Sequence, residues 1–181
     1  MLNLQEQYRK TIIPALQKEF SIANVMAVPK LSKVTINVGV GRFFKEDKVL
    51  ARIAKDIEML SGQKPVYRTA KKSIASFKVR QGVPVGVSVT LRGTRMYDFV
   101  NRLINIALPR SKDFRGIDIK NIDMAGNLNL GLRESSIFPE LNYENMKDIF
   151  SLQVTITTTA HTQAEGIALL THMGFPIKKS K

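Results

Sequence analysis

The chain has 181 residues and no cysteine, 44% of its residues are hydrophobic, and its formal net charge is +13. The absence of cysteine excludes disulfides and cysteine-based zinc sites, and the hydrophobic content suits one folded domain with a real core. No apolar run approaches the roughly 20 residues that are needed to cross a bilayer.

The positive charge is concentrated in one part of the chain. Residues 64–115 hold 12 lysines and arginines against 2 acidic residues, a net charge of +10, whereas residues 1–63 give +4 and residues 116–181 give −1. A concentrated positive field is typical of proteins that bind phosphate backbones, so a polyanionic partner is expected.

The N-terminal stretch over residues 3–20 predicts an amphipathic helix, in which Pro14 marks a kink or a break. It has mixed charges and no continuous apolar segment or small-residue cleavage site, so it is not expected to be a signal peptide.

The next segment alternates with period two over residues 31–40, which predicts a strand with an apolar buried face made of Val34, Ile36, Val38 and Val40. Residues 46–60 predict a helix with one apolar stripe, which Gly62 ends in a left-handed conformation. A short strand is expected over residues 65–68.

The middle of the chain begins with residues 70–82, which have no clean period and predict a long exposed loop. Residues 83–92 alternate again, with an expected apolar face of Val85, Val87, Val89 and Leu91. A helix should then open at Thr94 as N-cap and stop at Pro109.

The C-terminal part starts with an irregular segment over residues 110–148. Residues 150–158 predict a last strand, and Thr162 with Glu165 forms a capping-box pattern that opens a final helix. The whole pattern predicts an α+β fold: a single domain over residues 1–181 with a mainly antiparallel sheet, helices packed on one face, an opposite face left open to solvent or to a partner, and a long basic loop.

The open face of this sheet should carry hydrogen-bonding side chains and a few cations: Lys33, Thr35, Asn37, Ser88, Thr90, Arg92, Gln153, Thr155 and Thr157. Two interpretations stay open. The face is an ordinary solvated surface on which threonine follows β-propensity, or it is a platform for the hydroxyls, phosphates and base edges of RNA.

The loop over residues 70–82 places four cations, Lys71, Lys72, Lys78 and Arg80, around Ser73, Ser76 and Phe77. A disordered surface loop would look similar, but glycines 82 and 86 bracket its return to the sheet, which favours a defined protrusion. Four phosphate contacts from such an arm would set a salt slope of about −3 in log K.

Signatures of catalysis are weak. Gly39 and Gly41 form only a fragment of a nucleotide-binding fingerprint, and no nucleophile with a neighbouring base is visible. His161 and His172 lack the spacing of a metal pair, so capping or surface roles are expected. We therefore expect a binding protein with no catalytic residue, metal, cofactor or small-molecule substrate.

Several blocks of the chain resemble one family in order and spacing. They are VTINVGVGR (34–42), LSGQKPVYRTAKKSIASFKVRQGVPVGVSVTLRG (60–93), MYDFVNRLINIALPRSKDFRG (96–116), GNLNLGL (126–132) and FPE (138–140). They are similar to the bacterial-type large-subunit ribosomal protein five family, which binds 5S rRNA in the central protuberance of the large subunit.

The resemblance implies binding of 5S rRNA through the sheet face and nearby loops, at positions that include Asn37, Gln63, Thr90 and Arg92. Lys33, Thr35 and Ser88 join this set from the polar-face pattern. The resemblance also implies that the basic loop reaches the peptidyl-site tRNA, with the contacting residues Lys71, Lys72, Ser73, Phe77, Lys78 and Arg80.

Further partners are implied by the same resemblance: 23S rRNA, a head protein of the small subunit and neighbouring proteins of the central protuberance, with no membrane. The expected location is the cytoplasmic ribosome, and the sequence does not separate it from an organelle of bacterial descent. Two other classes compete with this interpretation, an RNA-processing or RNA-modifying enzyme with a basic docking surface, and a basic protein on anionic membranes.

Overall fold

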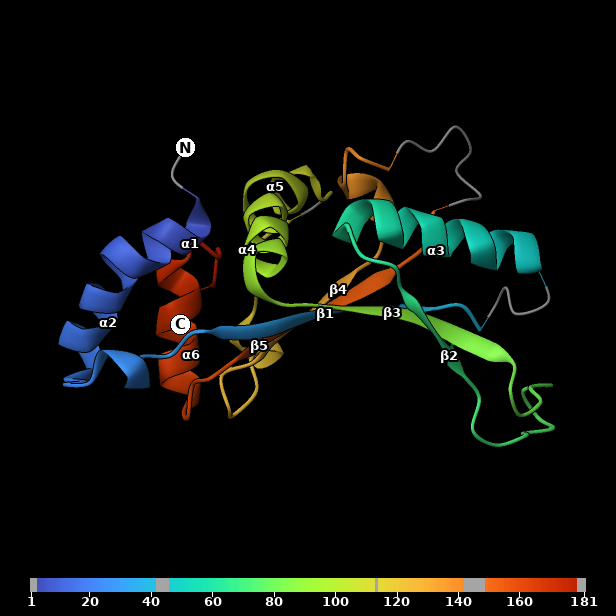
Figure 1. Cartoon of the computed structure of the whole chain (residues 1–181), viewed down its shortest axis with the longest axis horizontal. Helices are drawn as coiled ribbons and strands as arrows, with labels where there is room; N and C mark the ends of the chain where they lie inside the picture. Colours follow the sequence, from blue (N-terminus) through green and yellow to red (C-terminus); the bar gives the residue numbers. More distant parts are fainter. Residues whose placement is uncertain (1–2, 42–45, 113, 142–148, 179–181) are drawn as a thin grey trace. The chain divides into compact units, whose positions relative to one another are not determined.

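The structure, a computed structural model, describes residues 3–41, 46–112, 114–141 and 149–178. Its five strands form one sheet in the order β2-β3-β1-β5-β4, accompanied by helices, which confirms the predicted α+β class and mainly antiparallel sheet (Figure 1). No helix within these described ranges is long and apolar enough to cross a membrane.

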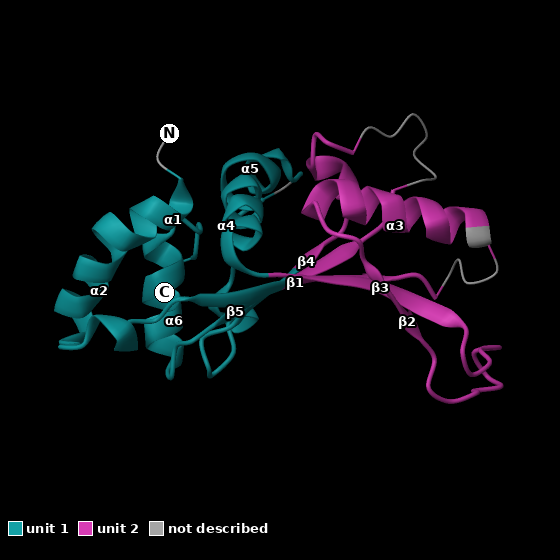
Figure 2. Cartoon of the chain, viewed as in Figure 1, with its two compact units in different colours: residues 1–34, 92–130, 155–181 teal, residues 35–91, 131–154 magenta. Residues whose placement is uncertain are grey.

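The chain divides into two compact units, shown in Figure 2. Unit 1 comprises residues 1–34, 92–130 and 155–181, and unit 2 comprises residues 35–91 and 131–154. The expectation of one domain over the full length stays a prediction.

Unit 2 contains the helix α3 (Asp47–Ser61) and the strands β2 (Val66–Thr69) and β3 (Pro84–Leu91). It also holds the C-terminal part of β1 (Leu31–Gly39). The alternation predicted for β1 is confirmed, because its apolar positions are buried while Asn37 is exposed. Gly62 follows α3 with φ 65°, a left-handed conformation that glycine adopts without a steric cost, as predicted.

Unit 1 is mainly helical, with short helical segments between its longer elements. Its helices and strands are α1 (Leu4–Gln7), α2 (Ile13–Phe20), α4 (Gly93–Arg102), α5 (Leu108–Arg110), α6 (Gln163–His172) and parts of β4 (Leu128–Leu132) and β5 (Leu152–Thr158). Tyr8 and Tyr97 pack near one another between α1 and α4, with ring centroids 6.3 Å apart.

Two prolines in unit 1 lie inside helical segments and do not end them. Each follows a single π-helical turn, over Tyr8–Ile12 before Pro14 and over Leu103–Ala107 before Pro109. Proline lacks an N–H and its ring collides with the carbonyl four residues back. A widened turn removes that collision, so Pro14 does not break the helix. The helical run that was predicted to stop at Pro109 ends one residue later, at Arg110.

Two more predictions need correction. Thr94 is not the N-cap of α4, because Arg92 holds that position in an extended conformation and α4 begins at Gly93. The segment predicted as irregular over residues 110–148 contains β4, whose leucines are buried and whose Asn129 and Gly131 are exposed. Residues 142–148 of that segment lie outside the described residues.

The capping-box prediction for the last helix is confirmed in its main contact. Thr162 Oγ1 accepts a hydrogen bond from the N–H of Glu165 at 3.3 Å. The Glu165 carboxylate accepts from the N–H of His161 at 2.9 Å, one residue before the N-cap. The side chains of Thr162 and Glu165 therefore both accept hydrogen bonds from backbone N–H groups at the start of α6.

Candidate RNA-binding surface

The polar face of unit 2 follows directly from the strand period. On β3, Val87, Val89 and Leu91 are buried, and α3 packs against this strand. Figure 2 shows α3 on one side of the strands of unit 2, with no described helix of that unit on the other side. The opposite positions therefore face outward, as predicted for Thr35, Asn37 and Thr90, of which Asn37 is exposed and the two threonines are half-buried.

Ser88 differs from the prediction, because it is only 5% exposed although its position belongs to the polar face. Its hydroxyl accepts a hydrogen bond from Arg68 Nε at 2.8 Å, and Arg68 is exposed. The side chain from the neighbouring strand β2 thus covers Ser88, which the pattern of a single strand does not reveal.

Gln63 lies just after α3, at the edge of unit 2. Its backbone is fixed by Ser61, whose hydroxyl oxygen accepts the N–H of Gln63 at 3.2 Å and lies 2.9 Å from its carbonyl oxygen. The Gln63 side chain is half-buried, so part of it is available to a ligand.

The two cations predicted for this face, Lys33 and Arg92, belong to unit 1. Lys33 is half-buried on β1, and Arg92 is exposed at the N-cap of α4. On β5, Gln153 is exposed, and the hydroxyl of Thr155 donates to Asn129 Oδ1 at 2.8 Å. The Thr155 hydroxyl therefore already uses its proton within the protein.

The basic loop between β2 and β3, here called the arm (residues 70–82), was predicted to be a long exposed loop with a defined course, and the structure shows that it is a hairpin. Ile74 and Val79 exchange backbone hydrogen bonds of 3.0 and 3.3 Å. At its base, Ala70 pairs with Val83 and Gly82 through hydrogen bonds of 2.8 and 3.0 Å. These bonds give the arm a fixed course even though residues 71–78 are all exposed.

The predicted contact residues of the arm divide by what their side chains do. Ser73 Oγ accepts from the N–H of Gln81 at 3.0 Å, so it supports the arm across its two limbs. Phe77 is 71% exposed, which is unusual for a large aromatic side chain. The other predicted contacts, all cations, are exposed and form no ion pair with any described carboxylate: Lys71, Lys72, Lys78 and Arg80.

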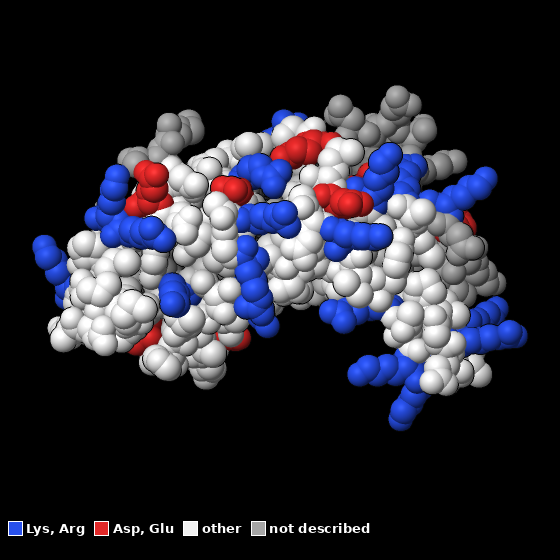
Figure 3. Space-filling view, viewed as in Figure 1, with Lys and Arg blue, Asp and Glu red and all other residues white. Residues whose placement is uncertain are grey.

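The charge distribution of the arm is visible in Figure 3, where its projecting end carries blue and white side chains and no red on the face drawn. A pocket of about 640 Å³ lies at the arm and is lined by Gly41, Ala70, Lys71, Lys72, Ile74, Phe77, Val79 and Val85. Apolar lining with lysines beside it suits a flat ring or a sugar attached to a phosphate.

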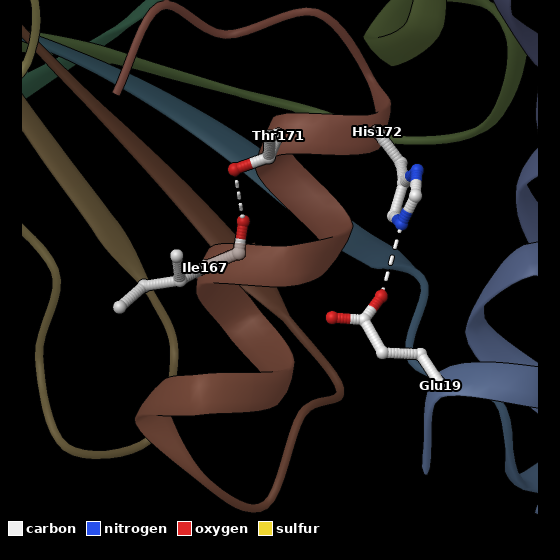
Figure 4. Close-up of polar contacts among 4 residues, drawn as sticks. All are labelled: Glu19, Ile167, Thr171 and His172. Atoms are coloured by element: carbon white, nitrogen blue, oxygen red, sulfur yellow. Dashed lines mark hydrogen bonds and ion pairs between the residues drawn. The ribbon is translucent and has the colours of Figure 1, made fainter. Parts of the chain in front are cut away.

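Of the two histidines considered for metal binding in the sequence, His172 lies beside a carboxylate of α2. His172 Nε2 lies 3.0 Å from Glu19 Oε2, and the neighbouring Thr171 hydroxyl donates to the carbonyl of Ile167 at 2.8 Å (Figure 4). Over the described ranges, no group of three or more histidine, aspartate or glutamate side chains could hold a metal ion.

Among the described residues, three groups have shifted pKa values, and all three belong to unit 1. Burial, with a contribution from the Tyr97 ring, raises the pKa of Tyr8 to about 12, and Tyr8 Oη donates to the carbonyl of Pro29 at 2.9 Å. Burial also raises the pKa of Tyr97. The Asn127 side chain donates to Asp123 and lowers the pKa of that exposed carboxyl.

One residue of the surface was missed in the sequence. Arg68 stands in a four-residue strand, and no periodic pattern indicates which way its side chain points. Its direction follows from the antiparallel register with β3, where Arg68 lies opposite Gly86. In the sequence, the signal for this direction was Gly86, a glycine in a strand that otherwise alternates.

The fold and these surfaces define a basic α+β protein suited to a polyanionic partner. Comparison with known proteins gives the family: the description "Ribosomal protein L5" matches residues 24–80, and the C-terminal model of the same ribosomal family matches residues 84–177. The chain belongs to the ribosomal protein L5 family, which confirms the resemblance.

Three bacterial relatives, each named "Large ribosomal subunit protein uL5", match nearly full length. The protein of Desulfatibacillum aliphaticivorans is 48% identical over 99% of this chain and 100% of its own length. That of Idiomarina loihiensis is 49% identical with the same coverage. That of Nitrosomonas europaea is 48% identical over 98% of this chain and 99% of its own length.

Family membership decides between the classes that compete on the sequence alone. The chain is a bacterial-type ribosomal protein with a structural role, and it is not an enzyme. The alternative of an RNA-processing or RNA-modifying enzyme is therefore wrong.

Proposed function

We propose that this chain is a structural constituent of the large ribosomal subunit that anchors 5S rRNA through the polar strand face. The proposed contacts in unit 2 are Thr35, Asn37, Gln63 and Thr90, with Ser88 acting through its hydrogen bond from Arg68. Lys33 and Arg92 are the proposed contacts in unit 1. The arm reaches the peptidyl-site tRNA through its four cations and Phe77. The observation that carries the proposal is the match to proteins named for the large subunit over 98–99% of the chain.

Two physical features support different roles for the face and the arm. The face of unit 2 presents neutral donors and acceptors such as Asn37 and Thr90, which fix the register of an RNA through specific hydrogen bonds. The arm presents cations that have no described ion pair, and such groups supply affinity by neutralising phosphates.

The further partners in this proposal are 23S rRNA, a head protein of the small subunit and neighbouring proteins of the central protuberance. Family membership supports them, and the net charge of +13 is suited to a site surrounded by RNA. The proposed location is the ribosome.

The test is binding of the purified chain to 5S rRNA and to a duplex RNA of equal length across a salt series. We expect tight, selective binding to 5S rRNA with a modest salt slope, because hydrogen bonds of the face add selectivity without releasing counterions. Equal affinity for both RNAs with a steep slope would contradict the proposal, since only the charge would then act.

A further inference from the structure

A small polar cluster on the face of unit 2 is centred on Gly86. Arg68 lies opposite Gly86 in the antiparallel register, so both residues point to the same side of the sheet. A Cβ placed on Gly86 would lie 3.6 Å from Arg68 Cβ and 3.9 Å from Asn37 Oδ1. Arg68 on β2 and Asn37 on β1, both exposed, therefore flank Gly86 from the two strands that neighbour β3.

Arg68 is held in one direction by the protein. Its Nε donates to the buried hydroxyl of Ser88 at 2.8 Å, and the register with β3 shifts between Arg68 and Thr69. Such irregularities redirect side chains at sheet edges. In the part of the chain that the structure describes, Arg68 makes no ion pair and no other side-chain hydrogen bond, so its terminal amino groups remain for a ligand.

We infer that Arg68 binds a backbone phosphate of the docked RNA, and that Ser88 orients the Arg68 guanidinium instead of touching the RNA itself. Asn37, on the other side of Gly86, then contacts the adjoining ribose or base edge. A planar guanidinium with two free amino groups matches a phosphate in geometry and charge. This inference rests on the proposed docking of 5S rRNA on the face, and it names a contact there that the family resemblance does not assign.

The experiment measures 5S rRNA affinity of full-length variants across a salt series. Arg68→Gln should weaken binding about tenfold and reduce the magnitude of the salt slope by roughly 0.7 to 0.9, the effect of one phosphate contact. Lys55→Gln, at an exposed cation of α3, is the matched control for net charge. An equal loss of slope in the control would overturn the inference, because Arg68 would then act only through total charge.

The role of Ser88 is tested by a double-mutant cycle. Ser88→Ala alone should weaken binding about threefold with an unchanged salt slope, because the Arg68 charge stays but loses its direction. Added to Arg68→Gln, it should have no further effect. Independent, additive losses would show that Ser88 does not act through Arg68.

Asn37→Ala and Thr90→Ala, measured in the same assay, separate failure of this inference from failure of the proposed function. If these variants and Arg68→Gln all bind as the wild type does, the face is not the docking surface and both are wrong. If the Asn37 and Thr90 variants bind weakly but Arg68→Gln matches Lys55→Gln, only the inference is wrong.

Discussion

Unit 1 and unit 2 differ in how their polar groups are used. In unit 1, Thr158 Oγ1 donates to the carbonyl of Gly126, and the Thr158 N–H donates to Asn127 Oδ1, at 3.0 and 2.9 Å. In unit 2, the cations of the arm and the amide of Asn37 stay exposed. Polar groups satisfied inside the protein stabilise the fold, whereas exposed groups without partners remain for a ligand.

The two units also differ in packing, which is close at α6 of unit 1 and open along the arm of unit 2. In unit 1, a Cβ on Gly166 would overlap the backbone of Gly126, so α6 lies directly against the turn that precedes β4. In unit 2, residues 71–78 of the arm are all exposed. We therefore expect substitutions in the packed interior of unit 1 to change the free energy of unfolding. Substitutions of the proposed contacts, on the arm and face of unit 2 and at Lys33 and Arg92 of unit 1, should change RNA binding.

The largest effect is expected for the arm, when Lys71, Lys72, Lys78 and Arg80 are all replaced by alanine. The salt slope for tRNA contact should fall in magnitude by about 3, because four phosphate contacts are lost. Binding of 5S rRNA and the free energy of unfolding should change little. The measurements are tRNA contact in assembled particles, 5S rRNA titration and urea unfolding.

The control for this variant removes the same amount of charge elsewhere, by replacing the exposed lysines Lys18, Lys30, Lys55 and Lys120 with alanine. It should leave tRNA contact nearly intact. Unchanged tRNA contact in the arm variant, or an equal loss in the control, would contradict the role proposed for the arm.

The next effect concerns stability and is expected at Gly166. Alanine is the better helix former by up to about 1 kcal/mol, but its methyl would collide with the Gly126 backbone. We expect Gly166→Ala to lower the free energy of unfolding by about 3 kcal/mol, measured by urea titration. Gly131→Ala, at an exposed strand position with nothing within 4 Å, should change it by less than about 0.5 kcal/mol.

A loss at Gly166 that is no greater than the loss at Gly131 would show that α6 and the turn before β4 can separate without cost. The claim that unit 1 is stabilised by close packing at this position would then be wrong. The Gly166 variant, where folded, should bind 5S rRNA with wild-type affinity, because Gly166 is not among the proposed contacts.

A smaller effect is expected when Asn37 and Thr90 on the face are both changed to alanine. Affinity for 5S rRNA should fall about thirtyfold, from the loss of two hydrogen bonds of about 1 kcal/mol each. The salt slope should stay nearly constant, since neither residue neutralises a phosphate. Gln7→Ala with Thr11→Ala removes two exposed polar side chains from unit 1 as a control. Unaltered affinity of the first variant would exclude the face as the docking surface.

The elements predicted well from sequence are those with a long periodic pattern. Residues 33–39 of β1 alternate without interruption, and α3 has both an apolar stripe and a terminal glycine. The strand β4 was missed because it has only five residues and its outward positions hold asparagine and glycine, which are typical of turns. The π-helical turns before Pro14 and Pro109 were not predicted, because a proline within a helical pattern is compatible with a kink, a stop or a widened turn.

The candidate surface was predictable to the extent that it depends on one strand or one loop. Charge clustering indicated the arm, and the period of β1 indicated Asn37. Burial of Ser88 and the direction of Arg68 depend on pairing between β2 and β3, including the shift in register after Arg68. Such relations between strands come from tertiary structure, and the pattern within each strand does not contain them.

The smallest effect is expected at Tyr8, and it depends on pH. Folding raises the pKa of Tyr8 from 10.0 to about 12, so the neutral form is favoured in the native state. The stabilisation that the folded chain gains from keeping Tyr8 neutral is therefore fully present below about pH 10. It is lost as the pH rises through about 12. Tyr8→Phe also removes the hydrogen bond to Pro29, which should cost about 1 kcal/mol near neutral pH.

Tyr8→Phe removes both the hydrogen bond and the ionisation of Tyr8, so the difference in the free energy of unfolding between variant and wild type should change with pH. The variant should be less stable than the wild type at about pH 8, and the gap should narrow towards about pH 11.5, where only the wild type loses the contribution of Tyr8. Tyr97, whose pKa burial also raises, ionises in both proteins and cancels in the comparison. Urea unfolding at several pH values measures the gap. A constant gap would mean that Tyr8 ionises equally easily in the folded and unfolded chains, and that its burial in unit 1 is not maintained in solution.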